Sequence, residues 1–238
     1  GRCISHELAS LGATVVVADR NAEGAAEVAN ALKAVRPQAR AVRLEVTDRR
    51  QVDEVVAGLA GEMGAIDILV HSAGVGMERK FLETSDEDWS RLIDINLNGT
   101  FHVAQATARV MAERRHGRIV LISSVAGLRG GTGRAAYGST KGAIVALGKV
   151  MAVELGPLGV TTNIIAPGAI ETELVKRMHD DETRRAYLRG IPLGRYGTPE
   201  EVADVITFLA SDASAYLNGV VLGIDGGFLG AGVIKADR

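Results

Sequence analysis

Arg-Ile-Val-Leu-Ile at positions 118–122 is a short, almost continuously apolar run that is rich in β-branched residues. Such a run is typical of a parallel strand that is covered on both faces of its sheet. The segment that follows changes period, because Ile144, Leu147, Val150 and Met151 recur at the spacing of an amphipathic helix. A strand followed by a long helix is the repeating unit of a parallel α/β sheet.

The same alternation continues in both directions from this stretch. Five more runs have the composition of buried strands: 14–18, 41–44, 66–70, 161–165 and 220–224. Helical periodicity lies between them, as in residues 52–59. The pattern predicts an α/β fold, a doubly wound parallel sheet of Rossmann type with right-handed crossovers. Because no linker, repeat or composition break interrupts it, residues 1–238 are interpreted as a single domain.

The beginning of the sequence departs from this scheme. Ile4, Leu8 and Leu11 form one stripe of an amphipathic helix, with no strand before it. A doubly wound domain needs a strand there, so we expect a fragment that lacks its first strand and most of a glycine-rich turn. An open slot is then expected between the strands at 14–18 and 66–70. Low stability and poor ligand binding at this turn should follow, and roughly 15–20 restored residues should repair both.

Composition excludes several classes of function. The formal net charge of −2 argues against non-specific binding of nucleic acid. Charged residues such as Lys149 and Glu154 interrupt the apolar runs before they reach the ~20 residues of a membrane span. No signal peptide is recognised at the N-terminus, so we expect a soluble, cytoplasmic protein.

Metal binding is not predicted. Cys3 is the only cysteine, which leaves no disulfide framework and no zinc ligand set. His71, His102 and His116 have no second ligand at metal spacing, so each is interpreted as a structural or surface histidine.

A group of polar residues with a fixed spacing is the candidate site. Tyr137 and Lys141 are one helical turn apart and share a face, and Ser124 precedes the tyrosine by thirteen residues. Tyr-x-x-x-Lys alone is a weak signal, expected by chance in roughly one such sequence in ten. The surrounding segments make it specific. They are Asp-Ile-Asn-Leu at 94–97, residues 163–172 with their Ala-Pro-Gly turn, and Asp-Gly-Gly at 225–227.

In this order and spacing, these motifs resemble those of the short-chain dehydrogenase/reductase family along essentially the whole chain. Two departures stand out. The family's Thr-Gly-x-x-x-Gly-x-Gly fingerprint survives only as Gly1, and its usual Asn-Asn-Ala-Gly is His-Ser-Ala-Gly at 71–74. The resemblance implies hydride transfer between a nicotinamide cofactor and an alcohol/carbonyl pair.

The resemblance also assigns roles to the catalytic residues. Tyr137 is the acid–base, and Ser124 holds the substrate oxygen. Lys141 bonds the nicotinamide ribose, and as an adjacent cation it is expected to lower the tyrosine pKa from its ordinary value of about 10. Asn96 anchors a water that joins Lys141 to solvent.

The cofactor is predicted to be NAD, with NADP as the alternative. Asp19 follows a strand, where its carboxylate accepts hydrogen bonds from an adenosine ribose and repels a 2′-phosphate. Arg20 speaks for NADP, because it can pair with that phosphate. Asp19 could also cap the helix that begins near Asn21. The other expected contacts are Gly1, Glu45, Val46, Ser72, Ala73, Gly74, Pro167, Gly168, Ile170 and Thr172.

The substrate is predicted only as a small secondary alcohol or ketone. Residues 173–195 are expected to close over it. Four apolar residues of this segment have two interpretations: they form an apolar wall beside the substrate, or they are part of ordinary helix packing. They are Leu174, Met178, Tyr187 and Ile191. A 3-oxoacyl thioester on an acidic carrier protein is the alternative; it needs a basic face, and Arg115 has no second cation near it in 156–159. A cofactor-free Rossmann binding protein is a further alternative.

A homotetramer is expected, mainly from the resemblance. The helices predicted around 98–115 and 137–155 carry small apolar residues that are interpreted as outer positions suited to pairing across a two-fold axis. These residues are Ala104, Ala108, Ala143 and Ala146.

Overall fold

A computed structural model describes residues 1–232, except for the side chain of Leu174. The six strands are β1 (Val16–Asp19), β2 (Arg40–Arg43), β3 (Ile68–His71), β4 (Gly117–Ile122), β5 (Val160–Pro167) and β6 (Val221–Ile224). All pairings among them are parallel, with β1 next to β2 and the order β3-β4-β5-β6 in the other sheet. The predicted α/β fold is confirmed, and each predicted strand lies within two residues of an observed one.

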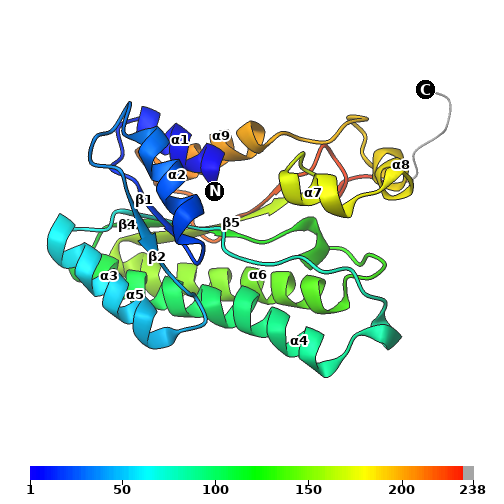
Figure 1. Cartoon of the computed structure of the whole chain (residues 1–238), viewed down its shortest axis with the longest axis horizontal. Coiled ribbons are helices and arrows are strands. Elements are labelled where there is room, and N and C mark those ends of the chain that lie inside the picture. The colour runs from blue at the N-terminus through cyan, green and yellow to red at the C-terminus, as the bar shows by residue number, and fades with distance from the viewer. Residues whose placement is uncertain (233–238) are drawn as a thin grey trace.

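Helices cover both faces of the strands (Figure 1). On one face lie α1 (Arg2–Ser10), α2 (Ala22–Leu32) and α9 (Pro199–Ala210), and on the other lie α3 (Arg49–Met63), α5 (Gly99–Arg114) and α6 (Ala135–Leu155). The shorter helices α4 (Asp86–Leu92), α7 (Glu173–Met178) and α8 (Asp181–Gly190) are found toward one end of the molecule. This arrangement is the doubly wound architecture that the sequence predicts.

The central strands explain why the run at 118–122 is apolar throughout. Leu121 packs with Ile144 against α5 and α6, whereas Val120 packs with Ile206 and Leu209 on the α9 side. Successive residues of a strand point to opposite faces, so a strand covered on both sides needs apolar residues at every position. This packing fixes the end of β4, from which the candidate site is built.

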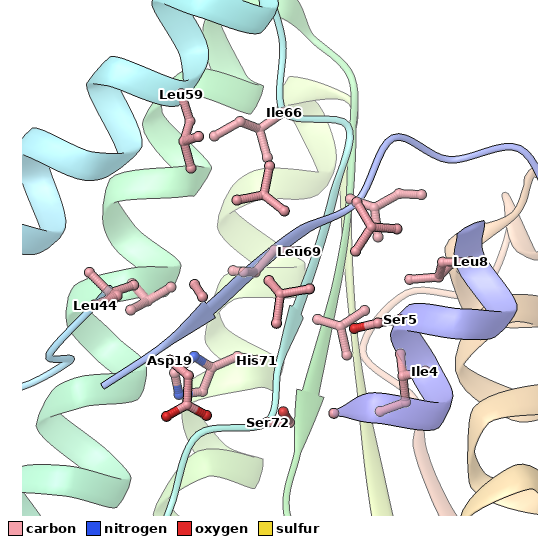
Figure 2. Close-up of a pocket in the computed structure, with 18 of the residues that line it drawn as sticks. Ile4, Ser5, Leu8, Asp19, Leu44, Leu59, Ile66, Leu69, His71 and Ser72 are labelled. Carbon is pink, nitrogen blue, oxygen red and sulfur yellow. The ribbon is translucent and has the colours of Figure 1, made fainter. Parts of the chain in front are cut away.

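An open slot separates the two sheets. In residues 1–232 no ladder joins β1 to β3, and a cavity of about 670 Å³ lies between them. Figure 2 shows its apolar part around Leu59, Ile66 and Leu69, with Asp19, His71 and Ser72 gathered toward the other end. The predicted slot between these strands is therefore confirmed.

The prediction for the small residues on α5 and α6 is partly wrong. Ala104 and Ala108 are buried within the same core as Met111 and Ile144, so they are not outer positions. Ala146 is exposed and Ala143 is half-buried. The outer surface of these helices instead exposes larger apolar side chains, Phe101 on α5 and Val150 and Val153 on α6.

Candidate active site

The loop after β4 brings Ser124 against α6. Two glycines allow this approach, because an added Cβ on Gly127 would lie 2.6 Å from the carbonyl carbon of Lys141, and one on Gly138 would lie 2.7 Å from the Ala126 oxygen. The backbone N–H of Ala126 donates to Ser124 Oγ over 3.2 Å, which begins the short 3₁₀ turn η3 (Val125–Gly127). Ser124 is thereby fixed at the C-terminal edge of the sheet, where ligands of open α/β sheets bind.

Tyr137 and Lys141 occupy one face of α6, as their spacing predicts. Lys141 Nζ lies 5.8 Å from the centre of the Tyr137 ring and donates a 2.9 Å hydrogen bond to the carbonyl oxygen of Ile122. The lysine is buried, and this desolvation lowers its pKa to about 8. The end of β4 and the first turns of α6 thus hold the ammonium beside the tyrosine.

The pKa of Tyr137 differs from the sequence-based expectation. Burial has the largest effect and raises this pKa, while the Ser124 hydroxyl and Arg134 lower it. Tyr187 contributes a smaller increase. Arg134, which the sequence analysis did not consider, is one cation that favours the phenolate.

Asn96 lies behind Lys141 on a π-helical turn, η2 (Ile93–Asn98), between α4 and α5. Its amide is fully buried; it accepts from Val75 N–H (2.8 Å) and donates to the Val75 oxygen (3.0 Å) and to Thr140 Oγ1 (3.2 Å). π-Helical turns are frequent at functional sites. In this structure the amide of Asn96 is used by protein groups and fixes the turn after β3.

Gly74 connects this turn to the catalytic group. A Cβ on Gly74 would lie 3.1 Å from Asn96 Oδ1 and 3.7 Å from Lys141 Nζ. The missing side chain therefore leaves a small cradle bounded by Asn96 and Lys141. Such a cradle suits the close approach of a polar group such as a nicotinamide ribose.

The other end of the proposed cofactor site lies at the slot. Five predicted contacts line the same cavity: Gly1, Asp19, Val46, Ser72 and Ala73. Asp19 and Ser72 appear near each other in Figure 2, at the carboxyl ends of β1 and β3. Their convergence fits an adenosine placed along the strand ends.

Asp19 does not cap α2. Its carboxylate accepts from the Asn21 N–H over 2.8 Å, and Asn21 is itself the N-cap, accepting from Gly24. The helix begins at Ala22, so Asn21 and not Asp19 is the residue directly before it. Asp19 therefore keeps carboxylate capacity for a ligand.

Arg20 and Glu45 are not brought into this cavity. Arg20 is exposed, and Glu45 Oε1 accepts from the Thr47 hydroxyl over 3.1 Å in its own turn. The neighbouring Val46 is buried, and its carbonyl oxygen lies 3.0 Å from His102 Nδ1. Of these two neighbouring predicted contacts, Val46 therefore lines the cavity and Glu45 does not.

The loop after β5 carries the remaining predicted contacts. Pro167 ends the strand, and a Cβ on Gly168 would lie 2.9 Å from Asp225 Cα. Ile170 forms a backbone bridge with Gly197, and Thr172 caps α7 by accepting from the Val175 N–H over 3.2 Å. The loop is held in place at both ends.

His71 is an unexpected member of the site. The imidazole is buried, and its Nε2 has no hydrogen-bond partner among the described residues. Burial, followed by the charge of Lys141, lowers its pKa to about 4, so it is neutral at pH 7. The sequence signal was the departure from the family's Asn-Asn-Ala-Gly. An orphaned polar atom in the lining of the slot fits a site that receives polar ligand groups.

Helices α7 and α8 occupy the region that was expected to cover substrate. Tyr187 and Ile191 belong to an apolar cluster with Ala169, Tyr196 and Phe228, so ordinary packing accounts for both. Met178 is half-buried, and the side chain of Leu174 lies outside the described part of the structure. Sequence reasoning missed His179, which stacks on Tyr187 at 4.9 Å and lies 3.0 Å from the Tyr196 hydroxyl through Nδ1.

Residues 1–232 contain no group of three or more His, Cys, Asp or Glu side chains placed to hold a metal ion. Within the same range, no helix has the length and apolar character that crossing a membrane requires.

Comparison with known proteins identifies the family. The model of a family described as enoyl-(acyl carrier protein) reductase matches residues 1–229. The chain is 36% identical over 227 residues to 3-oxoacyl-[acyl-carrier-protein] reductase FabG of Escherichia coli, covering 95% of this chain and 91% of the relative. The enzyme of the same name from Thermotoga maritima is 38% identical over 229 residues, covering 96% and 93%. The chain belongs to the short-chain dehydrogenase/reductase family.

Solved structures of other short-chain dehydrogenases/reductases share this fold. A gluconate 5-dehydrogenase from Burkholderia cenocepacia, in complex with NADP and tartrate, superposes with a TM-score of 0.93 at 36% identity and covers 98% of this chain and 92% of its own. A putative gluconate dehydrogenase from Agrobacterium tumefaciens gives 0.92 at 30% identity, covering 97% and 91%. The protein is therefore an NAD(P)-dependent oxidoreductase that acts on CH–OH groups.

Proposed function

We propose that this short-chain dehydrogenase/reductase interconverts a small secondary alcohol and its ketone, with Tyr137 as the acid–base. The observation that carries the proposal is the convergence of Ser124, Tyr137 and Lys141 at the end of β4, with Asn96 behind the lysine. The family membership also removes the cofactor-free binding protein from consideration.

Different side chains of the site orient the substrate oxygen, transfer the proton and stabilise the resulting charge. When bound, the nicotinamide ring supplies or accepts the hydride. Ser124 Oγ donates to the substrate oxygen and orients it, and Tyr137 gives its hydroxyl proton to that oxygen in reduction or removes it in oxidation. Lys141 places a positive charge beside the tyrosine, which stabilises the phenolate once the proton has left. Asn96 keeps the turn at Gly74 and Val75 in place behind the lysine.

The proposed cofactor is NAD, with NADP as the second candidate. Asp19 lines the cavity and its carboxylate repels a 2′-phosphate, whereas Arg20 does not line that cavity. The NADP in the gluconate 5-dehydrogenase complex supports the alternative. The ratio of kcat/KM values for NADH and NADPH decides between them. Asp19→Asn should shift that ratio toward NADPH by about tenfold, because it removes the repulsion.

Two substrate classes follow from the comparisons. The FabG relatives are named for 3-oxoacyl groups on a carrier protein, and the solved neighbours are named for gluconate, a polyhydroxy acid. A carrier protein needs a basic docking face. Arg115 donates to the Pro157 oxygen over 2.8 Å, and residues 156–159 provide no second cation. We favour the small polar substrate for this reason.

The test is a turnover assay at the nicotinamide absorption band. A panel of secondary alcohols, sugar acids, simple ketones and a 3-oxoacyl thioester is offered with either cofactor. The proposal predicts measurable reduction of at least one small ketone. Exclusive turnover of the thioester would support the second candidate, and no turnover of any compound by stably folded, cofactor-binding protein would contradict both.

A further inference from the structure

Arg134 stands immediately before α6, in contact with the proposed acid–base. Its guanidinium carbon lies 5.8 Å from the centre of the Tyr137 ring. Only 12% of its side chain is exposed, an unusual degree of burial for a cation. It also lowers the pKa of Tyr137. This charge therefore lies close to the tyrosine whose hydroxyl a substrate carbonyl must approach.

The loop after β3 holds Arg134 in this position. The Arg79 N–H donates to the carbonyl oxygen of Gly133 over 3.0 Å, and Arg79 forms an isolated parallel bridge with Arg134. Gly133 has a φ of +72°, and a Cβ there would lie 2.6 Å from Glu78 Cγ. A glycine is required for this turn and this contact. The backbone at 77–79 thus clamps residues 133–134 onto the start of the helix.

The protein partners of Arg134 leave much of its binding capacity unused. One oxygen of Glu78 lies 3.3 Å from the guanidinium, and nearly half of the Glu78 side chain is exposed. The carbonyl oxygen of Met77 accepts a second bond, also at 3.3 Å. Arginine carries five N–H donors in a rigid fork that matches a carboxylate. Two long contacts therefore leave donors for a ligand in a largely dry position.

The groups around Tyr187, which also influences Tyr137, are polar, but their cation is more closely paired. Tyr187 lies near enough to influence the pKa of Tyr137, and it stacks on His179. Arg184 is paired with Glu171, so this second cation is already neutralised by a nearby carboxylate. Arg134, with its weaker pair, is the better placed cation for an anionic substrate group.

We propose that Arg134 is a specificity-determining residue, which binds the carboxylate of a short oxo acid or hydroxy acid substrate. This inference rests on the proposed function and names its substrate class. In reduction the carbonyl carbon gains the hydride, its oxygen gains the proton of Tyr137, and the carboxylate stays ionised on Arg134. Glu78 competes with the substrate carboxylate for the same guanidinium.

The experiment compares two oxo acids with their methyl esters, which have the same carbonyl and no charge. Acetoacetate and levulinate are assayed beside the esters, and kcat and KM are measured separately. Wild-type protein should prefer at least one acid over its ester by tenfold or more in kcat/KM. Arg134→Gln should raise KM for that acid roughly 10- to 100-fold, because a charge-assisted bidentate contact is lost, and leave KM for the ester nearly unchanged.

A second variant should act in the opposite direction. Glu78→Gln removes the competing carboxylate, so it should lower KM for the acid. Arg185→Gln, which removes an exposed arginine on α8, is the matched control for charge and should change neither KM. The change in the pKa of Tyr137 that Arg134→Gln brings acts on kcat for acid and ester alike, and so does not imitate the effect on KM.

Distinct results would overturn the two proposals. If the esters are reduced as well as the acids, or if Arg134→Gln raises KM for both by the same factor, the role of Arg134 is wrong while the proposed function stands. If folded wild-type protein with bound cofactor reduces no ketone, acid or ester, the proposed function fails and this inference fails with it.

Discussion

His71 at the end of β3 makes the stability of the protein depend on pH. Its pKa falls from 6.5 to about 4 on folding, because burial disfavours the charged ring. Between these values the unfolded chain binds more protons, so stability is complete above pH 6.5 and decreases as the pH falls toward 4. The shift corresponds to about 3 kcal/mol. Denaturant unfolding of wild type and His71→Asn at pH 7 and pH 4.5 measures this effect.

His71→Asn controls for the pH dependence of stability that comes from all other acidic and basic groups, because these groups are the same in both proteins. His71→Asn keeps a polar side chain at the position and cannot titrate in this range. We expect its loss of stability between pH 7 and pH 4.5 to be smaller than that of wild type by a large part of that 3 kcal/mol. Equal losses in the two proteins would show that His71 does not carry the effect.

At the scale of single residues, sequence reasoning succeeded where local spacing determines the contact. Tyr137 and Lys141 share a face because they are one helical turn apart. The capping role considered for Asp19 was wrong, because α2 begins at Ala22 and its N-cap is Asn21. The position of Arg134 was not predictable in this way. It depends on a clamp between residues 77–79 and 133–134, which are distant in sequence and carry no periodic pattern.

At the scale of elements, the slot between β1 and β3 predicts that an added strand stabilises the fold. Among residues 1–232 the facing edges of these strands have no ladder partners, and the cavity between them is lined largely by apolar side chains such as Val17 and Ile68. Joining a β-branched segment and a glycine turn ahead of Gly1 should fill the slot. Thermal unfolding should then shift upward by about 2–4 °C for each kcal/mol gained.

An extension of equal length made of glycine and serine is the control, because it adds chain without strand propensity or apolar surface. Only the β-branched extension should raise the melting temperature and strengthen NADH binding. If both extensions give the same melting temperature, pairing in the slot is not the source of the gain.

The strands were predictable because burial on both faces demands an apolar residue at each position, and this leaves a clear mark on β4 and β5. The π-helical turn at Ile93–Asn98 left no such mark. It depends on the hydrogen bonds of Asn96 to Val75, which join two segments that meet only in the folded chain.

At the scale of the whole molecule, the outer faces of α5 and α6 predict self-association, and a homotetramer remains the proposed state. Phe101, Val150 and Val153 are 42%, 51% and 76% exposed. Exposed apolar side chains on adjoining helices are typical of a surface that a second copy covers. Light scattering should give an oligomeric mass, and Val150→Lys with Val153→Glu should reduce it. A monomeric mass for the folded wild-type protein would contradict this prediction.

The central claim is that Tyr137 exchanges the proton with substrate, and the variant Tyr137→Phe tests it most directly. Phenylalanine keeps the ring that packs near Arg134 and Lys141 and removes only the hydroxyl. The measurement is the rate of NADH oxidation with a ketone that the wild type reduces, at cofactor concentrations where fluorescence shows both proteins saturated. We predict NADH affinity within about twofold of wild type and a rate at least roughly 100-fold lower. A rate within tenfold of wild type under these conditions would contradict the account.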